Sequence, residues 1–383
     1  MRGKMSWRFC VPAILLVGVN LVLVTILQPS WTNPPLRQAP AVVLGEAEHP
    51  ALTRKCFSYS GVKAENICCK MHWYKHEGDI LECVRRANVE ALVSRRAGSP
   101  SLPPEPDDVA FLTGKVDWAF PEEPSPDRLI DAAHWVIIGD SYMRYLFDVI
   151  ARRASGPGLQ YRMSETKGGW APAALLLNAL RNRTIHEDIE VRHLAAPFRI
   201  TYYTDFLLKR LPELIKQWEL EPHLKPSVVV MGTGLHWMRA AKTTYAESGP
   251  DAAMTNVTKY FRSLVPHLSR LAKTAPTIFK LLDDVQDSHL TENPEYSAEI
   301  FRRYNSLFRE SLRDTGVFVW DSNLPLSEAY TKECLVTNAI TYDFRWRCFD
   351  HIHAGYIVQE QFGDMVFNFI CNKHLNLPSD YCT

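Results

Sequence analysis

Trp135-Val-Ile-Ile-Gly-Asp-Ser141 is the stretch that decides the fold of this chain. Its four apolar residues end at a glycine, which is typical of a parallel strand buried on both faces. The apolar residues of 143–153 then recur at helical spacing, which predicts an amphipathic helix. A buried strand followed at once by a helix indicates the first unit of an α/β domain.

The same alternation continues towards the C-terminus. Short apolar runs predict further strands at 228–231, 278–282 and 317–320. Helical spacing predicts helices over 206–220, 257–271, 298–312 and 356–371, with Pro212 and Pro266 as potential kinks. We therefore expect residues 129–383 to form an α/β domain, a three-layer sandwich around a mostly parallel sheet.

The N-terminus predicts a membrane anchor. Residues 9–28 are almost wholly apolar and long enough for a helix to cross a hydrocarbon layer of about 30 Å. Arg2, Lys4 and Arg8 precede this run, so residues 1–8 are expected to form a cytosolic tail, with the rest of the chain in the lumen. The prediction is a single-pass type II membrane protein. A cleaved signal peptide is the alternative, and it also leads into the secretory pathway.

The segment after the anchor is rich in proline and cysteine. Residues 29–52 are predicted to form a stem. Residues 53–128 are predicted to form a cysteine-rich unit with a proline-rich linker and a helix over 79–95. Beyond Cys10 in the anchor there are eight cysteines: Cys56, Cys68, Cys69, Cys83, Cys334, Cys348, Cys371 and Cys382. An even set in an oxidising compartment predicts up to four disulfides of open pairing. Zinc is the weaker alternative, because no CxxC pair occurs.

The net charge and two short motifs indicate which kinds of partner and compartment to expect. The formal net charge is zero, so there is no electrostatic reason to expect a nucleic-acid partner. Asn182 and Asn256 begin glycosylation sequons, which fit a lumenal domain.

Ser141 is the first candidate for chemistry, because it stands where the first buried strand gives way to a helix. A hydroxyl there projects from the sheet edge, and the N–H groups of the helix start face any anion formed beside it. The alternative is that Ser141 only caps the helix.

A second polar motif, Asp350-His-Ile-His353, lies just before the last predicted helix. A serine hydroxyl becomes a good nucleophile when an imidazole takes its proton and a carboxylate orients that imidazole. The spacing of Asp350 and His353 lets the carboxylate meet one ring nitrogen while the other faces Ser141. We favour His353 over His351 as the base, because His351 adjoins Asp350 and is expected to point elsewhere. The three side chains are predicted to form a catalytic triad.

Gly139-Asp-Ser141 near the start of an α/β domain, with Asp350-x-x-His353 near its end, resembles the GDSL/SGNH hydrolase superfamily. With the anchor and the clustered cysteines, residues 53–383 look like the PC-esterase branch, which includes trichome birefringence-like proteins and relatives of a capsule-acetylation protein. The resemblance implies a Golgi enzyme that moves acetyl groups onto glycan hydroxyls through an acyl-serine. It implies no bound cofactor. Acetyl-CoA or another acyl ester would be the co-substrate. The sequence shows no nucleotide-binding loop, so the alternatives are a local contact to CoA and presentation of the donor by another membrane protein.

The resemblance also implies an oxyanion hole, and here the sequence departs from the pattern. SGNH proteins usually carry an asparagine where this chain has Gly232-Thr-Gly-Leu-His-Trp237. Gly234 and His236 are the candidates at that place, and Gly168 or Gly169 is the candidate for a second N–H donor. A packed histidine and a simple turn are the respective alternatives.

For several other polar or aromatic positions we weigh a role in the fold against a role in binding. Carboxylates at a strand end more often cap helices than bind metal, so no metal is expected at Asp283, Asp284 and Asp287. Arg144 is a candidate for binding an anion or for a surface ion pair. The aromatic clusters at 72–74 and 344–347 are candidates for sugar stacking or for packing.

The leading functional prediction is an O-acetyltransferase that acts on a polysaccharide or glycoprotein glycan. The same triad serves a glycan or lipid esterase if water replaces the sugar hydroxyl. A non-catalytic glycan-binding or scaffold protein is the alternative from another class, and the intact set of nucleophile, base and carboxylate argues against it.

Overall fold

The computed structural model describes residues 57–60, 63–66, 70–97, 109–110, 130–164, 169–181, 185–287, 290, 292–337 and 345–381. Residues 1–56, with the predicted tail, anchor and stem, lie outside this set. Among the described residues, no helix is long and apolar enough to cross a membrane.

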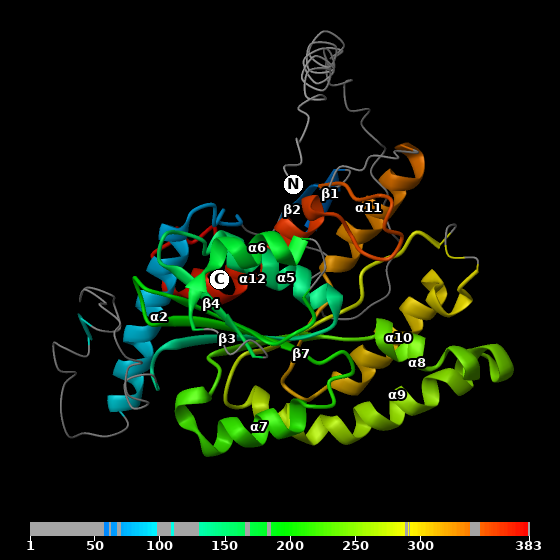
Figure 1. Ribbon diagram of the computed structural model, residues 1–383, viewed down its shortest axis with the longest axis horizontal. Helices are drawn as coiled ribbons and strands as arrows, with labels where there is room; N and C mark the ends of the chain where they lie inside the picture. The colour runs from blue at the N-terminus through cyan, green and yellow to red at the C-terminus, as the bar shows by residue number, and fades with distance from the viewer. Residues whose placement is uncertain are drawn as a thin grey trace, which may run out of the picture. The chain divides into compact units, whose positions relative to one another are not determined.

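Strands and helices alternate in the C-terminal half as the sequence predicts, whereas the elements between residues 159 and 204 lie in a region for which it predicted none (Figure 1). The strands are β1 (Phe57–Ser60), β2 (Lys63–Asn66), β3 (Ala133–Gly139), β4 (Leu159–Met163), β5 (Ala171–Pro172), β6 (Ile189–His193), β7 (Phe198–Thr204), β8 (Val228–Gly232), β9 (Thr277–Lys280) and β10 (Phe318–Trp320). The helices are α2 (Glu77–Ala97), α5 (Ser141–Arg153), α6 (Ala173–Arg181), α7 (Leu211–Leu220), α8 (Leu235–Ala240), α9 (Lys242–Ala272), α10 (Ala298–Leu312), α11 (Asn323–Thr337) and α12 (Tyr356–Cys371). Short 3-10 turns cover Pro222–Leu224, Pro294–Tyr296 and Asn372–His374.

The main sheet has the strand order β10-β9-β8-β3-β7-β6-β4-β5 within the described residues. From β10 to β7 all neighbours are parallel, whereas β6, β4 and β5 extend the sheet in antiparallel pairs. The predicted mixed α/β fold with a mostly parallel sheet is confirmed. β1 and β2 form a separate antiparallel pair.

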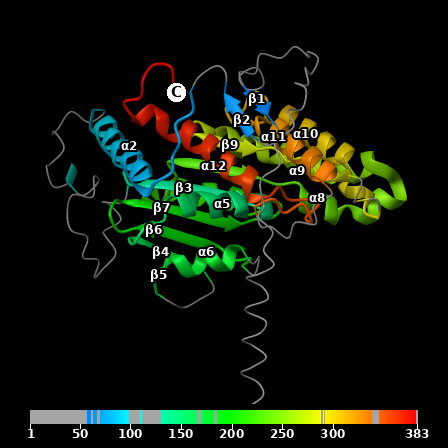
Figure 2. The same cartoon turned by 90° about the horizontal axis from the view of Figure 1, so that it is seen from above.

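Helices cover both faces of the parallel part of the sheet. Alternate residues of β3 enter two different cores, because successive side chains of a strand point to opposite faces. Trp135 and Ile137 pack with α2, α5, α6 and α12, whereas Val136 and Ile138 pack with α7, α9 and α10. Figure 1 shows α5, α6 and α12 above the sheet and α7 and α9 below it, and Figure 2 shows the strands side by side. The arrangement has three layers.

α2 lies in the segment assigned to a cysteine-rich unit, and it packs into the same core as α12. Ile80 and Val84 are fully buried there. The Cys83–Cys371 disulfide joins the two helices across 288 residues of sequence. A second disulfide, Cys334–Cys348, spans 14 residues. The predicted disulfides are therefore present at these four cysteines, and Cys56, Cys68, Cys69 and Cys382 lie outside the described residues.

Two helix predictions need correction. The helix expected over 206–220 begins only at Leu211, because Pro212 occupies its first turn, where a missing N–H costs nothing. The helix expected over 257–271 begins earlier, at Lys242, and its torsions break at Gly249 rather than at Pro266. Gly249 has φ of 80°, a conformation that glycine adopts without a steric penalty.

Candidate active site

The strand order reverses between β3 and β8, and this is where the candidate residues gather. From β3 the chain passes through β4, β5 and β6 and returns to β7 on one side of β3, before it crosses to β8 on the other side. In open α/β sheets, the crevice at such a switch point lies beyond the carboxyl ends of the strands and binds ligands. Gly139 and Gly232 are paired at these two ends. A Cβ atom on Gly139 would lie 2.1 Å from the Gly232 carbonyl oxygen, so only glycine fits.

Asp140, not Ser141, caps the helix that follows β3. Its buried side chain accepts a hydrogen bond from the Tyr142 N–H at 3.1 Å. Burial raises the pKa of Asp140 to about 7, although the Tyr142 N–H and the charge of Lys280 favour its ionised form. The capping alternative for Ser141 is therefore wrong, because Asp140 fills that role and leaves the serine hydroxyl available.

Ser141, His353 and Asp350 meet in one relay of hydrogen bonds. Ser141 Oγ lies 2.7 Å from His353 Nε2. His353 Nδ1 lies 3.0 Å from Asp350 Oδ2 and 3.2 Å from Oδ1. The structure thus brings together the three side chains, across 212 residues of sequence, as predicted. His351 turns its backbone carbonyl to the Gln286 N–H instead.

The Asp350 carboxylate is held by its own loop. Oδ1 accepts hydrogen bonds from the N–H groups of Ile352 at 3.2 Å and His353 at 3.1 Å. On the other side, Arg347 Nε lies 3.3 Å from Oδ2, and both side chains are largely buried. The carboxylate therefore meets His353 in an orientation that three neighbours fix.

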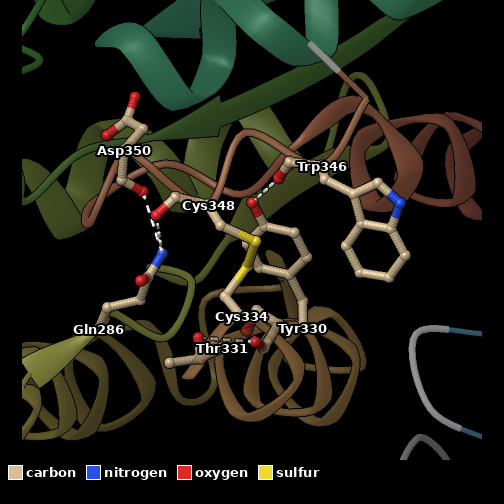
Figure 3. Close-up of a disulfide and its surroundings, with 8 residues drawn as sticks. Gln286, Tyr330, Thr331, Cys334, Trp346, Cys348 and Asp350 are labelled. Atoms are coloured by element: carbon tan, nitrogen blue, oxygen red, sulfur yellow. Dashed lines mark hydrogen bonds between the residues drawn. A yellow bond between two sulfur atoms is a disulfide. The ribbon is translucent and has the colours of Figure 1, made fainter. Parts of the chain in front are cut away.

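This acid–base loop, residues 345–355, is anchored to the sheet and to α11 (Figure 3). The Cys334–Cys348 disulfide ties it to α11. Gln286, which follows β9, donates from Nε2 to the carbonyls of Cys348 at 3.1 Å and Asp350 at 3.4 Å. Since the loop lacks regular secondary structure, these contacts take the place of a strand or helix in holding Asp350.

Two tyrosines of α5 lie beside the His353 imidazole, and the sequence analysis did not identify either of them. The rings of Tyr142 and Tyr145 lie with their centroids 5.1 Å and 5.3 Å from that of His353. Tyr142 also donates its hydroxyl to the Ile352 carbonyl at 2.8 Å, which joins α5 to the acid–base loop. Residues four apart lie on the same face of a helix. The spacing of Ser141 and Tyr145 could therefore have indicated that Tyr145 lies near the site.

A second aromatic group lies beside β8. His236 stacks on Phe206, with ring centroids 4.3 Å apart and an interplanar angle of 10°. Thr233 donates its hydroxyl to the Phe206 carbonyl at 2.7 Å. Burial lowers the pKa of His236, and the charge of Arg239 lowers it further. A neutral His236 near the triad fits substrate binding, and that role stays a prediction.

The four predicted oxyanion or substrate positions have different outcomes. Gly234 stands at the start of α8 with φ of 155°, close to the switch point. His236 lies in the same short helix. Gly169 is exposed and precedes β5, which β7, β6 and β4 separate from β3, so the structure does not bring it to Ser141. Gly168 lies outside the described residues.

The remaining polar candidates mostly serve the fold. Arg144 is not in a surface ion pair, because it is buried and donates to the Ile185 carbonyl at 2.8 Å. Asp283 is buried against Lys280, and Asp287 Oδ1 accepts from the Ala298 N–H at the start of α10. No cluster of three or more potential metal ligands occurs in the part of the chain that the structure describes.

The two aromatic clusters and the sequons complete the set. Tyr74 is buried and donates to Asn372 Oδ1 at 2.6 Å, and the ring of Trp346 stacks on Tyr330. These contacts favour packing over sugar stacking. Asn256 is exposed on α9, and its glycosylation stays a prediction, while Asn182 lies outside the described residues.

No protein-family model matches the chain. Among solved structures, it is similar to Axe2, an acetylxylan esterase from Geobacillus stearothermophilus, with 14% sequence identity and a TM-score of 0.33. That match covers 64% of this chain and 97% of the esterase. A catalytic mutant of the same enzyme matches over the same shares, with 13% identity and a TM-score of 0.34. Likeness at this level carries no information on activity or substrate.

Proposed function

We propose that this chain is a serine-dependent acyl-transfer enzyme that uses Ser141, His353 and Asp350. The observation that carries the proposal is the relay from Ser141 Oγ to His353 Nε2 and from His353 Nδ1 to the Asp350 carboxylate. This is the geometry that a serine needs to lose its proton as it attacks a carbonyl. Its position at the switch point, beside the start of α5, adds N–H groups that favour a developing oxyanion.

In the first step, Ser141 Oγ bonds to the acyl carbon of an ester or thioester donor and its proton passes to His353 Nε2. The leaving group departs with that proton, and the acyl group remains on Ser141. In the second step, an acceptor hydroxyl attacks the acyl-serine and gives its proton to His353. The proton returns to Ser141 as the new ester leaves. Asp350 accepts from Nδ1–H throughout and favours the transient imidazolium.

The finer proposal is an O-acetyltransferase whose acceptor is a hydroxyl of a polysaccharide or glycoprotein glycan. The paired motifs around Ser141 and Asp350 support it, as does the stacked His236–Phe206 pair, which offers an aromatic face to a sugar. We propose that the enzyme is a single-pass type II membrane protein, which the apolar N-terminal run and the basic residues before it support. A location in the Golgi follows only from the resemblance to the PC-esterase branch. Acetyl-CoA or another acyl ester is the proposed donor.

The test is mass spectrometry of the purified full-length protein after brief exposure to p-nitrophenyl acetate. We expect an acetyl adduct on the Ser141 peptide. Ser141→Ala should carry no adduct there and should lose turnover by at least about a thousandfold. An adduct that persists elsewhere in Ser141→Ala, with unchanged turnover, would contradict the proposal and favour a scaffold or binding role.

A second measurement separates transfer from hydrolysis. The acetylated protein is incubated with and without an oligosaccharide acceptor, and both free acetate and acetylated sugar are measured. A transferase loses its adduct faster with the sugar present and yields acetylated sugar. Acetate release at one rate in both samples would instead make the protein an esterase.

A further inference from the structure

We propose that Arg347 is the positioning residue of the acid–base pair, and that its guanidinium sets both the orientation and the charge balance of Asp350 beside His353. This inference rests on the proposed function, and it concerns a residue with no place in the serine, histidine and carboxylate set. It is supported by an ion pair, an aromatic contact and the backbone conformation of Arg347.

The first contact is the ion pair itself. Arg347 Nε lies 3.3 Å from Asp350 Oδ2, the oxygen that also lies 3.0 Å from His353 Nδ1. The side chains of Arg347 and Asp350 are only 4% and 10% exposed. A charge that is shielded from water needs a partner, and the attraction between such a pair is little screened by salt. One carboxylate oxygen therefore faces two basic groups at once.

The second contact is the face of Tyr145. The Arg347 guanidinium carbon lies 4.8 Å from the centroid of the Tyr145 ring. The same ring lies edge-on to the His353 imidazole at 5.3 Å. A planar guanidinium stacks on an aromatic face in a way that a lysine ammonium does not. Arg347 thus touches both of the groups that border His353 on this side.

The third observation is the backbone at Arg347. It adopts φ of 52°, a left-handed conformation that is uncommon for a residue other than glycine. The conformation closes a turn in which the Asp350 N–H donates to the Arg347 carbonyl at 2.9 Å. Cys348, the next residue, is fixed to Cys334 by the disulfide. The turn and the disulfide together bring the guanidinium back onto the carboxylate that follows it.

These contacts predict two separable effects. The Arg347 guanidinium, held in place by its stacking on Tyr145, orients Asp350. Loss of the guanidinium should therefore lower the rate at which Ser141 reacts. The positive charge balances Asp350, so its loss should favour the imidazolium and keep the base protonated to higher pH. Other titratable groups near the imidazole include Tyr142 and Tyr145 of α5, whose rings lie beside it, and His236 of α8, which is close enough to interact with it electrostatically. The substitutions below change none of them.

The experiment measures how fast a fluorophosphonate probe labels Ser141 in the full-length protein, as a function of pH. The reaction bonds the serine oxygen to phosphorus, releases fluoride and passes the proton to His353, so it needs no known acceptor. The variants are Arg347→Met, which removes both the charge and the guanidinium, and Arg347→Lys, which keeps the charge alone. Arg345→Met is the matched control, because Arg345 is exposed in the same loop.

For Arg347→Met we expect the plateau rate at high pH to fall about tenfold to a hundredfold. The acidic limb of the profile should move up by roughly one pH unit. Arg347→Lys should return the acidic limb of the pH profile to its wild-type position. Its plateau rate should stay several-fold below that of the wild type. Arg345→Met should match the wild type in both. If Arg347→Met does not fold, the plateau of Arg347→Lys decides.

The failures are distinguishable. If the wild type is not labelled at Ser141, or Ser141→Ala is labelled equally fast, the proposed function falls. If Ser141 is labelled but both Arg347 variants keep the wild-type plateau and limb, the function stands and the positioning role is overturned. A plateau loss without any movement of the limb in Arg347→Met would overturn the charge-balance part.

Discussion

The nucleophile is held by regular secondary structure, whereas the acid–base pair is held by a loop. Ser141 starts α5 directly after β3, so strand pairing on both sides and helical hydrogen bonds fix its backbone. Asp350 and His353 lie between α11 and α12, where a disulfide, Gln286 and Arg347 provide the support. One half of the site therefore depends on regular secondary structure, and the other on a disulfide and side-chain contacts that hold an irregular loop.

The largest expected effects come from the two disulfides. Cys334–Cys348 closes a short loop beside the triad, so its removal by paired Cys→Ala substitutions should cost about 3 kcal/mol of unfolding free energy. Because this disulfide holds the acid–base loop, activity of the folded protein should also fall, by about tenfold or more. Urea unfolding and turnover of p-nitrophenyl acetate measure the two quantities.

The Cys83–Cys371 pair is the control for that experiment. It spans 288 residues and joins α2 to α12 away from the relay, so its removal should cost more stability, about 5 kcal/mol, and leave the turnover of the folded protein unchanged. Equal turnover in both double variants would show that the acid–base loop keeps its geometry without the disulfide.

A substitution at Asp140 tests the half of the site that contains Ser141. Its native pKa of about 7 lies above the ordinary value of 3.8, so the native state binds this proton more tightly than the unfolded chain does. The stability from this group is therefore full below about pH 4 and is lost as pH rises through about 7. Asp140→Asn keeps a capping oxygen but does not titrate. Between about pH 5 and pH 8, the wild type should lose about 2 kcal/mol relative to the variant.

Urea unfolding of both proteins at the two pH values checks this. A parallel pH dependence in wild type and Asp140→Asn would mean that the buried carboxyl does not take up a proton in this range, and that the cap is an ionised group.

The smallest expected effect is at the bond that joins the two halves. Tyr142 donates to the Ile352 carbonyl, and burial raises its pKa well above 10, so it remains a neutral donor. Tyr142→Phe should cost about 1 kcal/mol and reduce turnover a few-fold. Tyr260→Phe is the control, because Tyr260 donates to the Leu208 carbonyl at a site without triad contacts. A similar loss of turnover in both variants would remove any special role for the Tyr142 bond.

Much of the parallel core followed from local pattern. The predicted bounds 298–312 and 356–371 are those of α10 and α12, because each helix carries a long apolar periodicity. The strands and α-helices that the sequence analysis did not predict are β1, β2, β4, β5, β6, β7, α6, α8 and α11. β6 has only five residues, two of them charged and facing outwards, so its pattern is too short to distinguish a strand from a turn.

From the sequence, β3, most strands and helices of the C-terminal half, and the serine, histidine and carboxylate could be predicted, because apolar periodicity and short motifs are local properties of the chain. The tertiary structure was needed to show that Tyr142 and Tyr145 lie beside the imidazole, that Arg347 stacks on Tyr145, and that Gln286 holds the acid–base loop. Contacts of this kind depend on how distant segments pack, and the free energy of packing is shared among many residues and leaves no periodic trace in the sequence.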